Sequence, residues 1–315
     1  LVGSEMCIRD RINSGTVTCD TGTGVWSVSS GVYTGGYARL YTSRYARYQP
    51  GQGMMFRWTA AFTASTTGTT RSTALGVSGA VQVAGPIDRE DGYVFGYSGD
   101  AVNNQFGILH RRAGKIQIMT FTLGAYPTGA QTATITLNGL SYNVNLTVST
   151  SLAYTAEQIA AGLQTQLAGQ YWDIDSCSGQ LTFSYYSPGA RNGTYGFVST
   201  GTGVLATGSF VTTQLGATQV DTWTYQGSWD NQSIQFDPTK LNVYSVDFRW
   251  LGAGIVRFFM EDPNTGRMTL VHTQHWTRDQ TGIYPHINKP SLRISYRSGS
   301  ITGATPSQNA VIRGA

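Results

Sequence analysis

The chain has 315 residues, of which 12% are charged, 12% aromatic and 40% hydrophobic, and its formal net charge is +4. The hydrophobic and aromatic content excludes a disordered chain, and the small charge, without a block of Lys or Arg, argues against a nucleic-acid partner. No apolar run approaches the roughly 20 residues that cross a bilayer, so we expect no membrane insertion.

The first residues differ from the β-type pattern that follows them. The string LVGSEMCIRDR, residues 1–11, resembles the translated read-through of a sequencing adaptor at the edge of an environmental assembly. We therefore interpret residues 1–12 as foreign to the protein, the alternative being a genuine N-terminal arm. Cys7 lies in this segment, and together with Cys19 and Cys177 it forms neither a disulfide framework nor a zinc-type spacing.

Short β-type runs, separated by Gly and Ser, fill the next part of the chain. In residues 54–62, apolar or aromatic residues recur at every second position. This two-residue period predicts a strand with one buried face. By the same criteria, strands are predicted at residues 16–18, 25–28, 37–41, 74–83, 93–97 and 106–110.

The pattern changes near Ile116, where strands are followed by the one clear helix. Asn138-Gly139 predicts a tight hairpin between strands at 133–137 and 141–148, because both residues tolerate positive φ. For the helix, Thr155 is the expected N-cap, with Gln158 at capping-box spacing, and Gly169 is the expected C-terminal cap. Further strands are predicted at residues 116–123, 172–175, 180–186, 195–199 and 209–214.

The strongest β signal is a meander in the last third of the chain. Strands at 243–250 and 255–261 alternate apolar and polar residues, and a third begins at Met268. Between the second and third strands, Asp262-Pro263-Asn264-Thr265-Gly266 predicts a turn. Residues 292–296 form a last predicted strand.

Long amphipathic, aromatic-rich strands lie on both sides of the helix-containing segment. We therefore predict a mainly β fold, an antiparallel jelly-roll β-sandwich of residues 13–115 and 220–300. A small α+β domain, residues 116–219, is inserted between two of its strands and contains the one clear helix. Such insertions are tolerated at loop tips. Residues 301–315 are interpreted as a tail, possibly cut short at its end.

Two resemblances extend this prediction. The stretches RYQPGQGMMFRWTAAFT, DGYVFGYSGD and VYSVDFRWLGAGIVRFFMEDPNTGRMTLVH resemble concanavalin A-like (LamG-type) jelly rolls. The stretch TATITLNGLSYNVNLTVSTSLAYTAEQIAAGLQTQL resembles a small domain repeated through phage tail and virion proteins. The combination resembles structural proteins of tailed phages and large double-stranded DNA viruses. Many LamG-type domains bind calcium through loop side chains, but no matching acidic set is found, so we expect no cofactor and no metal.

The candidate catalytic groups do not form a recognisable set. Glycosidases need two carboxylates that face each other across roughly 5–10 Å. Glu90 and Asp91 are expected in a loop, in a solvated or a turn-forming role, and Asp262 in a turn-forming role. Asp173 and Asp175 share a strand face outside the predicted sandwich. The histidines are interpreted as packed or surface residues: His110, His272, His275 and His286.

Aromatic side chains are the remaining candidates for a binding site. They are expected either to stack on sugars or to pack in the core, and they are Trp223, Tyr225, Trp229, Tyr185 and Tyr186. The leading hypothesis is a non-enzymatic virion structural protein, located in the virion, whose partners are other virion proteins and further copies of itself. The alternative is an extracellular or particle-borne carbohydrate-binding module that recognises host surface glycans. A jelly-roll glycoside hydrolase or lyase is the third hypothesis.

Overall fold

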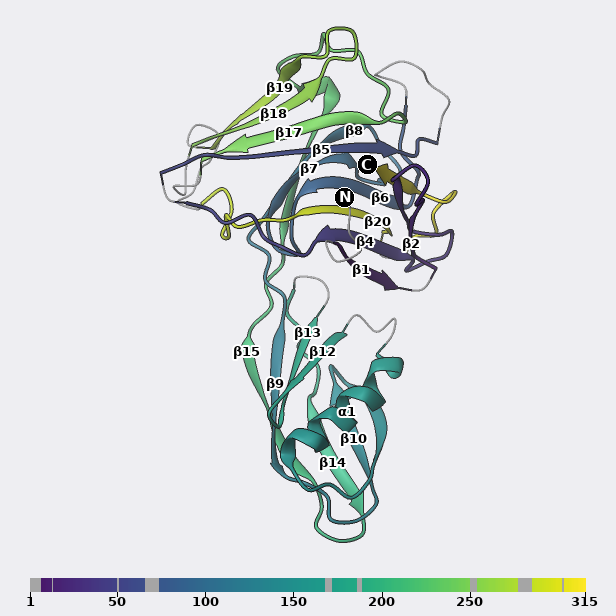
Figure 1. Cartoon of the computed structure of the whole chain (residues 1–315), viewed down its shortest axis with the longest axis vertical. Coiled ribbons are helices and arrows are strands. Elements are labelled where there is room, and N and C mark those ends of the chain that lie inside the picture. Colours follow the sequence, from purple (N-terminus) through teal and green to yellow (C-terminus); the bar gives the residue numbers. More distant parts are fainter. Residues whose placement is uncertain are drawn as a thin grey trace. The chain divides into compact units, whose positions relative to one another are not determined.

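A computed structural model describes residues 7–12, 14–49, 51–65, 74–167, 172–185, 189–249, 254–276, 285–301 and 303–315. The chain divides into two compact units (Figure 1). Unit 1 comprises Leu1–Arg112 and Val220–Ala315, and unit 2 comprises Ala113–Gln219. Both units are mainly β, and every strand pairing among the described residues is antiparallel. Within those residues, no helix is long and apolar enough to cross a membrane.

Unit 1 consists of two seven-stranded sheets. In order across the first sheet, the strands are β1 (Cys7–Ile12), β4 (Tyr37–Thr42), β20 (Ile294–Ser300), β6 (Ala80–Pro86), β7 (Gly92–Tyr97), β8 (Phe106–Arg112) and β16 (Val220–Tyr225). In order across the second sheet, they are β19 (Met268–His275), β18 (Ile255–Glu261), β17 (Asn242–Phe248), β5 (Met54–Phe62), β21 (Val311–Gly314), β3 (Trp26–Ser29) and β2 (Thr16–Cys19). A short 3₁₀ turn, η1 (Gln226–Ser228), follows β16.

The two sheets of unit 1 share one hydrophobic core, which makes this unit a β-sandwich. The first sheet contributes Tyr93, Phe95 and Tyr97 of β7, and all three side chains are fully buried. Tyr244 of β17, in the second sheet, lies 4.9 Å from Phe95 between ring centroids. The alternation that predicted these strands therefore separates side chains in the shared core from side chains on the opposite face of the sheet, a face that is also buried in β7. The predicted meander is confirmed as β17, β18 and β19, although Trp250 lies outside the described residues.

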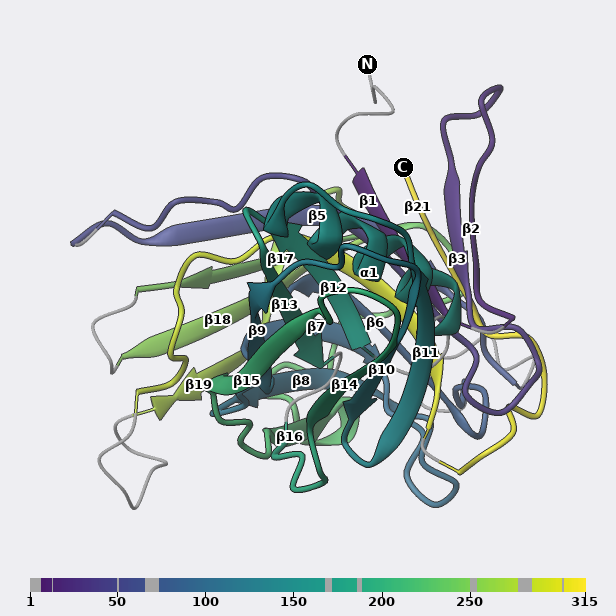
Figure 2. The same ribbon diagram turned by 90° about the horizontal axis from the view of Figure 1, so that it is seen from below.

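The C-terminal residues belong to the second sheet. Strand β21 lies between β5 and β3, and Ile312 is fully buried in the shared core. Figure 2 shows β21 beside β3 and β2. The interpretation of residues 301–315 as a tail is therefore corrected for Val311–Gly314. The strands that pair with β21, β3 and β5, are far from it in the sequence, so no local pattern shows this pairing.

Unit 2 contains a four-stranded sheet, a three-stranded sheet and helix α1 (Leu152–Gln166) around a second core. The four-stranded order is β12 (Trp172–Cys177), β13 (Gln180–Tyr185), β9 (Ile118–Ala125) and β15 (Thr207–Gln214). The three-stranded order is β11 (Leu140–Leu146), β10 (Gln131–Leu137) and β14 (Gly196–Gly201). The hairpin predicted at Asn138-Gly139 joins β10 to β11, and both residues have positive φ, 52° and 86°.

The helix begins earlier than predicted. Ser151 is its N-cap, and the Ser151 hydroxyl accepts a hydrogen bond from the Tyr154 amide at 3.1 Å. Thr155, the expected N-cap, lies inside the helix, where its hydroxyl donates to the Ser151 carbonyl. The Gln158 side chain bonds instead to Thr147. The sequence pattern predicted the wrong N-cap because Ser151 and Thr155 are both residue types that favour the N-cap position. The expected C-terminal cap, Gly169, lies outside the described residues.

Candidate functional site

Two of the predicted binding aromatics lie together on an edge strand of unit 1. Trp223 and Tyr225 are both on β16, the last strand of the first sheet, and their rings stack with centroids 6.1 Å apart and planes 7° apart. Both side chains are half-buried. Trp223 rests on an apolar cluster that includes Val94 and Leu109. The pair thus forms a supported, partly open aromatic platform of the type that binds sugar rings.

The other three predicted aromatics do not join this platform. Trp229 is a core residue with 2% of its surface exposed, and its indole N–H donates to the Thr224 carbonyl at 3.0 Å. Because its ring is enclosed by the core, we remove Trp229 from the candidate contacts. Tyr185 belongs to unit 2, where Arg191 lies 3.8 Å over its ring. Tyr186 lies outside the described residues.

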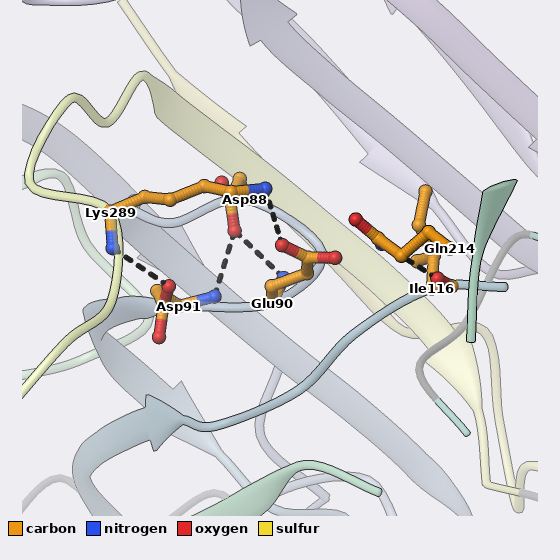
Figure 3. A network of polar contacts seen from close by, with 6 residues as sticks. All are labelled: Asp88, Glu90, Asp91, Ile116, Gln214 and Lys289. Carbon is orange, nitrogen blue, oxygen red and sulfur yellow. Dashed lines mark hydrogen bonds and ion pairs between the residues drawn. The ribbon is translucent and has the colours of Figure 1, made fainter. Parts of the chain in front are cut away.

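The acidic loop after β6 is a buried network rather than the expected solvated turn (Figure 3). Asp88 Oδ1 accepts hydrogen bonds from the amides of Glu90 and Asp91, at 2.7 and 2.8 Å. These two hydrogen bonds form the turn. Glu90 and Asp91 are nevertheless buried, with 5% and 0% exposure. The Lys289 ammonium contacts Glu90 Oε2 at 2.5 Å, and the Lys289 amide donates to Asp91 Oδ2 at 3.1 Å. The loop therefore clamps the segment that precedes β20.

Asp91 is the acid most perturbed by this environment. Burial raises the pKa of its carboxyl to about 6, against the pull of amide hydrogen bonds from Asn288 and Lys289, while the charges of Asp88 and Glu90 raise it further. Its Oδ1 atom has no hydrogen-bond partner among the described residues. The Asp91 carboxyl is thus held by backbone amide donors, which suits a structural role.

Two histidines form a second buried network at the same end of the sandwich. His286 Nε2 lies 3.2 Å from the Arg249 carbonyl and so carries the proton, which leaves Nδ1 to accept from the Tyr93 hydroxyl. His110 Nε2 likewise donates to the His286 carbonyl at 2.5 Å, and its Nδ1 accepts from the Gln274 side-chain amide at 3.0 Å. In each histidine, one ring nitrogen therefore donates a hydrogen bond and the other accepts one, as in a neutral imidazole.

Burial sets the charge of these histidines. Desolvation lowers the pKa of His110 to about 4, and it lowers the pKa of His286 to about 4 as well. Both rings are neutral at pH 7 and lie in a hydrogen-bonded packing role, as the sequence analysis interpreted them. Desolvation also raises the pKa of Tyr93 well above its ordinary value, so its hydroxyl remains a donor. Among the described residues, no group of three or more His, Cys, Asp or Glu is arranged to hold a metal ion.

The remaining carboxylate pairs are in turn or surface positions. Asp262 Oδ1 accepts from the Asn264 amide at 2.9 Å, and its carbonyl accepts from the Gly266 amide at 2.8 Å, which confirms the predicted turn. Asp173 and Asp175 are exposed on one face of β12 in unit 2.

An arginine and tyrosine cluster on the outer face of the first sheet was missed by the sequence analysis. Tyr41 of β4 lies under two guanidinium groups: Arg39 at 4.7 Å and Arg293 at 3.9 Å from its ring centroid. Tyr45 lies 4.5 Å from the same Arg293 guanidinium. In the sequence, its Arg and Tyr residues stand at alternate positions of two segments, residues 37–41 and 293–297. The cluster comprises Tyr37, Arg39, Tyr41, Tyr45, Arg293 and Arg297.

Comparison with known proteins does not assign the chain to a family. No protein-family model matches the sequence, and no curated protein matches it. The function therefore has to be argued from the two units and their surfaces.

Proposed function

We propose that the protein is a non-enzymatic structural component of a virion, in the capsid, a fibre or the tail, and that it assembles through unit 2. In this proposal, unit 1 is a concanavalin A-like jelly roll and unit 2 is a separately folding domain inserted into it. The observation that carries the proposal is an uncharged, apolar strand edge on unit 2, formed by β14, β15 and the residues between them (the β14–β15 edge).

The β14–β15 edge lacks the features that keep strand edges apart in monomers. Among the described strands, β14 pairs with β10 alone and β15 pairs with β9 alone. Neither strand contains a charged residue or a proline, the usual protection against edge-to-edge pairing. The exposed apolar side chains include Val198 at 61%, Val204 at 56% and Val211 at 60% exposure. Helix α1, by contrast, packs on β11 and β12 at the far ends of the two sheets.

An edge of this kind is suited to another β-strand as its partner. Pairing of two β15 strands related by a twofold axis would join two four-stranded sheets through main-chain hydrogen bonds. The same contact would bury Val211 of both copies. Partners are therefore further copies of the chain or other virion proteins with exposed strands.

Substitution of Val211 by lysine tests the assembly proposal. A charge on the edge disfavours strand pairing, so Val211→Lys is expected to lower self-association at least tenfold in sedimentation velocity while leaving the melting temperature unchanged. Val148→Lys is the matched control, because Val148 is 59% exposed and lies after β11. A wild-type chain that stays monomeric at high concentration contradicts assembly through this edge. Mass spectrometry of purified particles from the source sample tests the virion assignment separately.

A second candidate function, carbohydrate binding, is favoured by the Trp223–Tyr225 platform. The two nearly parallel rings lie together on β16 as half-buried side chains, and aromatic side chains commonly line ligand sites. In this function the partners are host surface glycans. On a glycan array, Trp223→Ala is expected to abolish any signal of the wild-type protein, whereas Trp172→Ala, in unit 2, is not. An array with no wild-type signal excludes this alternative.

A further inference from the structure

We propose that the arginine and tyrosine cluster on β4 and β20 is a binding site for an oxyanion, the sulfate or carboxylate group of an acidic polysaccharide. The inference goes beyond assembly through unit 2 and does not depend on it. Its choice of a polysaccharide rests on the glycan-binding alternative. The residues that form the site are Tyr37, Arg39, Tyr41, Tyr45, Arg293 and Arg297.

Strand register brings the arginines of distant segments together. Strands β4 and β20 are antiparallel neighbours, and Arg39 is directly opposite Arg297, while Tyr41 is opposite Ser295. Side chains two residues apart on a strand point to the same face, so these residues share the face that is turned away from the aromatic core. The Arg39 guanidinium also donates to Ser295 Oγ at 2.7 Å, which holds the two strands' side chains in one layer.

Two arginines of the cluster, Arg39 and Arg293, lack the ion pairs that other arginines of unit 1 form within the described residues. Arg111 and Arg257 each form an ion pair, with Asp221 and Asp247. No ion pair of the described residues involves Arg39 or Arg293. Arg39 is only 2% exposed, and its guanidinium donates hydrogen bonds to two neutral oxygens, Ser295 Oγ and the Ile87 carbonyl.

A bound oxyanion would supply negative charge to Arg293, whereas Arg39 has Asp10 of β1 opposite it in the strand register. Burial of a cation without a counter-charge is costly, and the planar guanidinium is well shaped for two parallel hydrogen bonds to sulfate or carboxylate. Binding of an anion at this face would therefore be favourable, and it would stabilise the cluster.

The tyrosine rings orient Arg293, which is half-buried. The Arg293 guanidinium lies over two rings, and its Nε atom has no hydrogen-bond partner among the described residues. Stacking limits the rotation of the guanidinium, so less entropy is lost when it binds an anion. Tyr45 is 46% exposed, which places this part of the cluster at the surface. Arg44 and Arg47, exposed in the same segment, add positive potential there.

The chemistry favours an acidic polysaccharide over a nucleic acid. Nucleic-acid binding uses a basic track that follows many phosphates, whereas this cluster is confined to two strands and the segment after β4. Base stacking also needs open aromatic faces, but Tyr41 is 7% exposed and lies against Arg39 and Arg293. A compact group of guanidinium ions fits one or two anionic groups on a sugar.

The test compares a sulfated heparin octasaccharide with its desulfated counterpart by calorimetric titration of the full chain. Wild-type protein is expected to bind the sulfated probe at least about tenfold more tightly, because its sulfate groups add charge-assisted hydrogen bonds to those of the carboxylates that both probes carry. Arg293→Gln is expected to remove most of this preference. Arg293→Lys is expected to restore it only in part, since lysine keeps the charge but loses the planar fork.

A control of equal charge separates the site from general attraction. Arg313→Gln removes an exposed arginine of β21, in the other sheet, and is expected to change the affinity less than twofold. If Arg293→Gln lowers the melting temperature, Tyr45→Ala serves instead, with an expected loss of about threefold from weaker stacking. Equal losses for Arg293→Gln and Arg313→Gln, or equal affinity for both octasaccharides, overturn the proposal. A single-stranded oligonucleotide of matched charge that binds more tightly, and depends on Arg293, overturns the choice of polysaccharide.

Discussion

Units 1 and 2 differ most in where their charges lie. The charged side chains of unit 2 are Lys115, Glu157, Asp173, Asp175 and Arg191. They give unit 2 a formal charge of −1, so the chain total of +4 leaves +5 for unit 1. The unit with few charges presents the uncharged β14–β15 edge, and the unit with the positive surplus presents the arginine and tyrosine cluster. The two proposals accordingly assign protein contacts to unit 2 and anion contacts to unit 1.

The interiors differ as well. Unit 1 buries titratable groups, among them His110, His286 and Asp91, beside its aromatic core. Unit 2 contains no histidine, and hydroxyl and amide side chains bridge its hairpin, such as Thr134 to Asn143 at 2.8 Å. Unit 1 should therefore respond to mild acid, and unit 2 should not. This contrast can be tested with variants that affect one unit at a time.

The largest effect is expected from core cavities. Phe95→Ala removes a fully buried ring that lies 4.9 Å from Tyr244 and 5.9 Å from Trp229. Loss of such a ring costs about 3–5 kcal/mol, and unit 1 is expected to unfold at a lower temperature while unit 2 keeps its transition. Phe121→Ala is the matched variant in unit 2, where Phe121 lies 4.8 Å from both Phe197 and Phe210.

Calorimetry combined with amide hydrogen exchange distinguishes the two units in this experiment. Each variant is expected to lose protection in the peptides of its own unit only. If both variants shift one common transition, the two units unfold as a single cooperative body. The proposal that unit 2 is a separately folding inserted domain would then be wrong.

A smaller effect is expected from acid, in unit 1. The folded-state pKa of His110 and of His286 is lowered to about 4 from 6.5, so their contribution to stability is present above pH 6.5 and is lost as the pH falls toward 4. Asp91 acts in the opposite sense: its pKa is raised to about 6 from 3.8, so its burial costs least at low pH. Unfolding therefore takes up about one net proton, and unit 1 should lose about 1 kcal/mol per pH unit between pH 6 and 4.5.

Urea titrations at pH 7, 6 and 5, followed by hydrogen exchange, measure this slope. Asp91→Asn removes the opposing carboxyl, so the slope should steepen, and stability at pH 7 should rise because no charge is buried. A variant that is less stable at pH 7 and keeps the wild-type slope would show that Asp91 is not the group that opposes the histidines. Unit 2 serves as the internal control in every titration.

Local patterns in the sequence predicted most strands, but they did not predict long-range partners. The alternation in residues 54–62 and the Asn138-Gly139 turn depend on neighbouring residues, and both predictions are confirmed. Arg39 and Ser295, by contrast, are 256 residues apart and meet only because β20 lies between β4 and β6. The arginine and tyrosine cluster is therefore visible in the sequence as two separate alternations. Only the strand order joins them into a site.

Burial of the acidic loop could not be predicted for the same reason. Residues 88–91 are the densest charge cluster of the chain, and charged loops are usually solvated. Lys289, which neutralises Glu90, comes from a segment 199 residues away. The ion pair that makes burial tolerable is thus a property of the tertiary fold and leaves no local signal.

The smallest effect is expected at the helix N-terminus in unit 2, where two residues compete for one role. Ser151→Ala removes the hydroxyl that accepts from the Tyr154 amide, and loss of such a cap costs about 1 kcal/mol. Thr155→Val keeps the shape of a fully buried side chain and removes only its hydrogen bond to the Ser151 carbonyl, so its cost should be smaller. Chemical denaturation of unit 2 measures both. A larger cost for Thr155→Val than for Ser151→Ala would place the helix start at Thr155, as the sequence pattern predicted, and would shorten α1 by its first turn. Unit 1 should be unaffected by either variant.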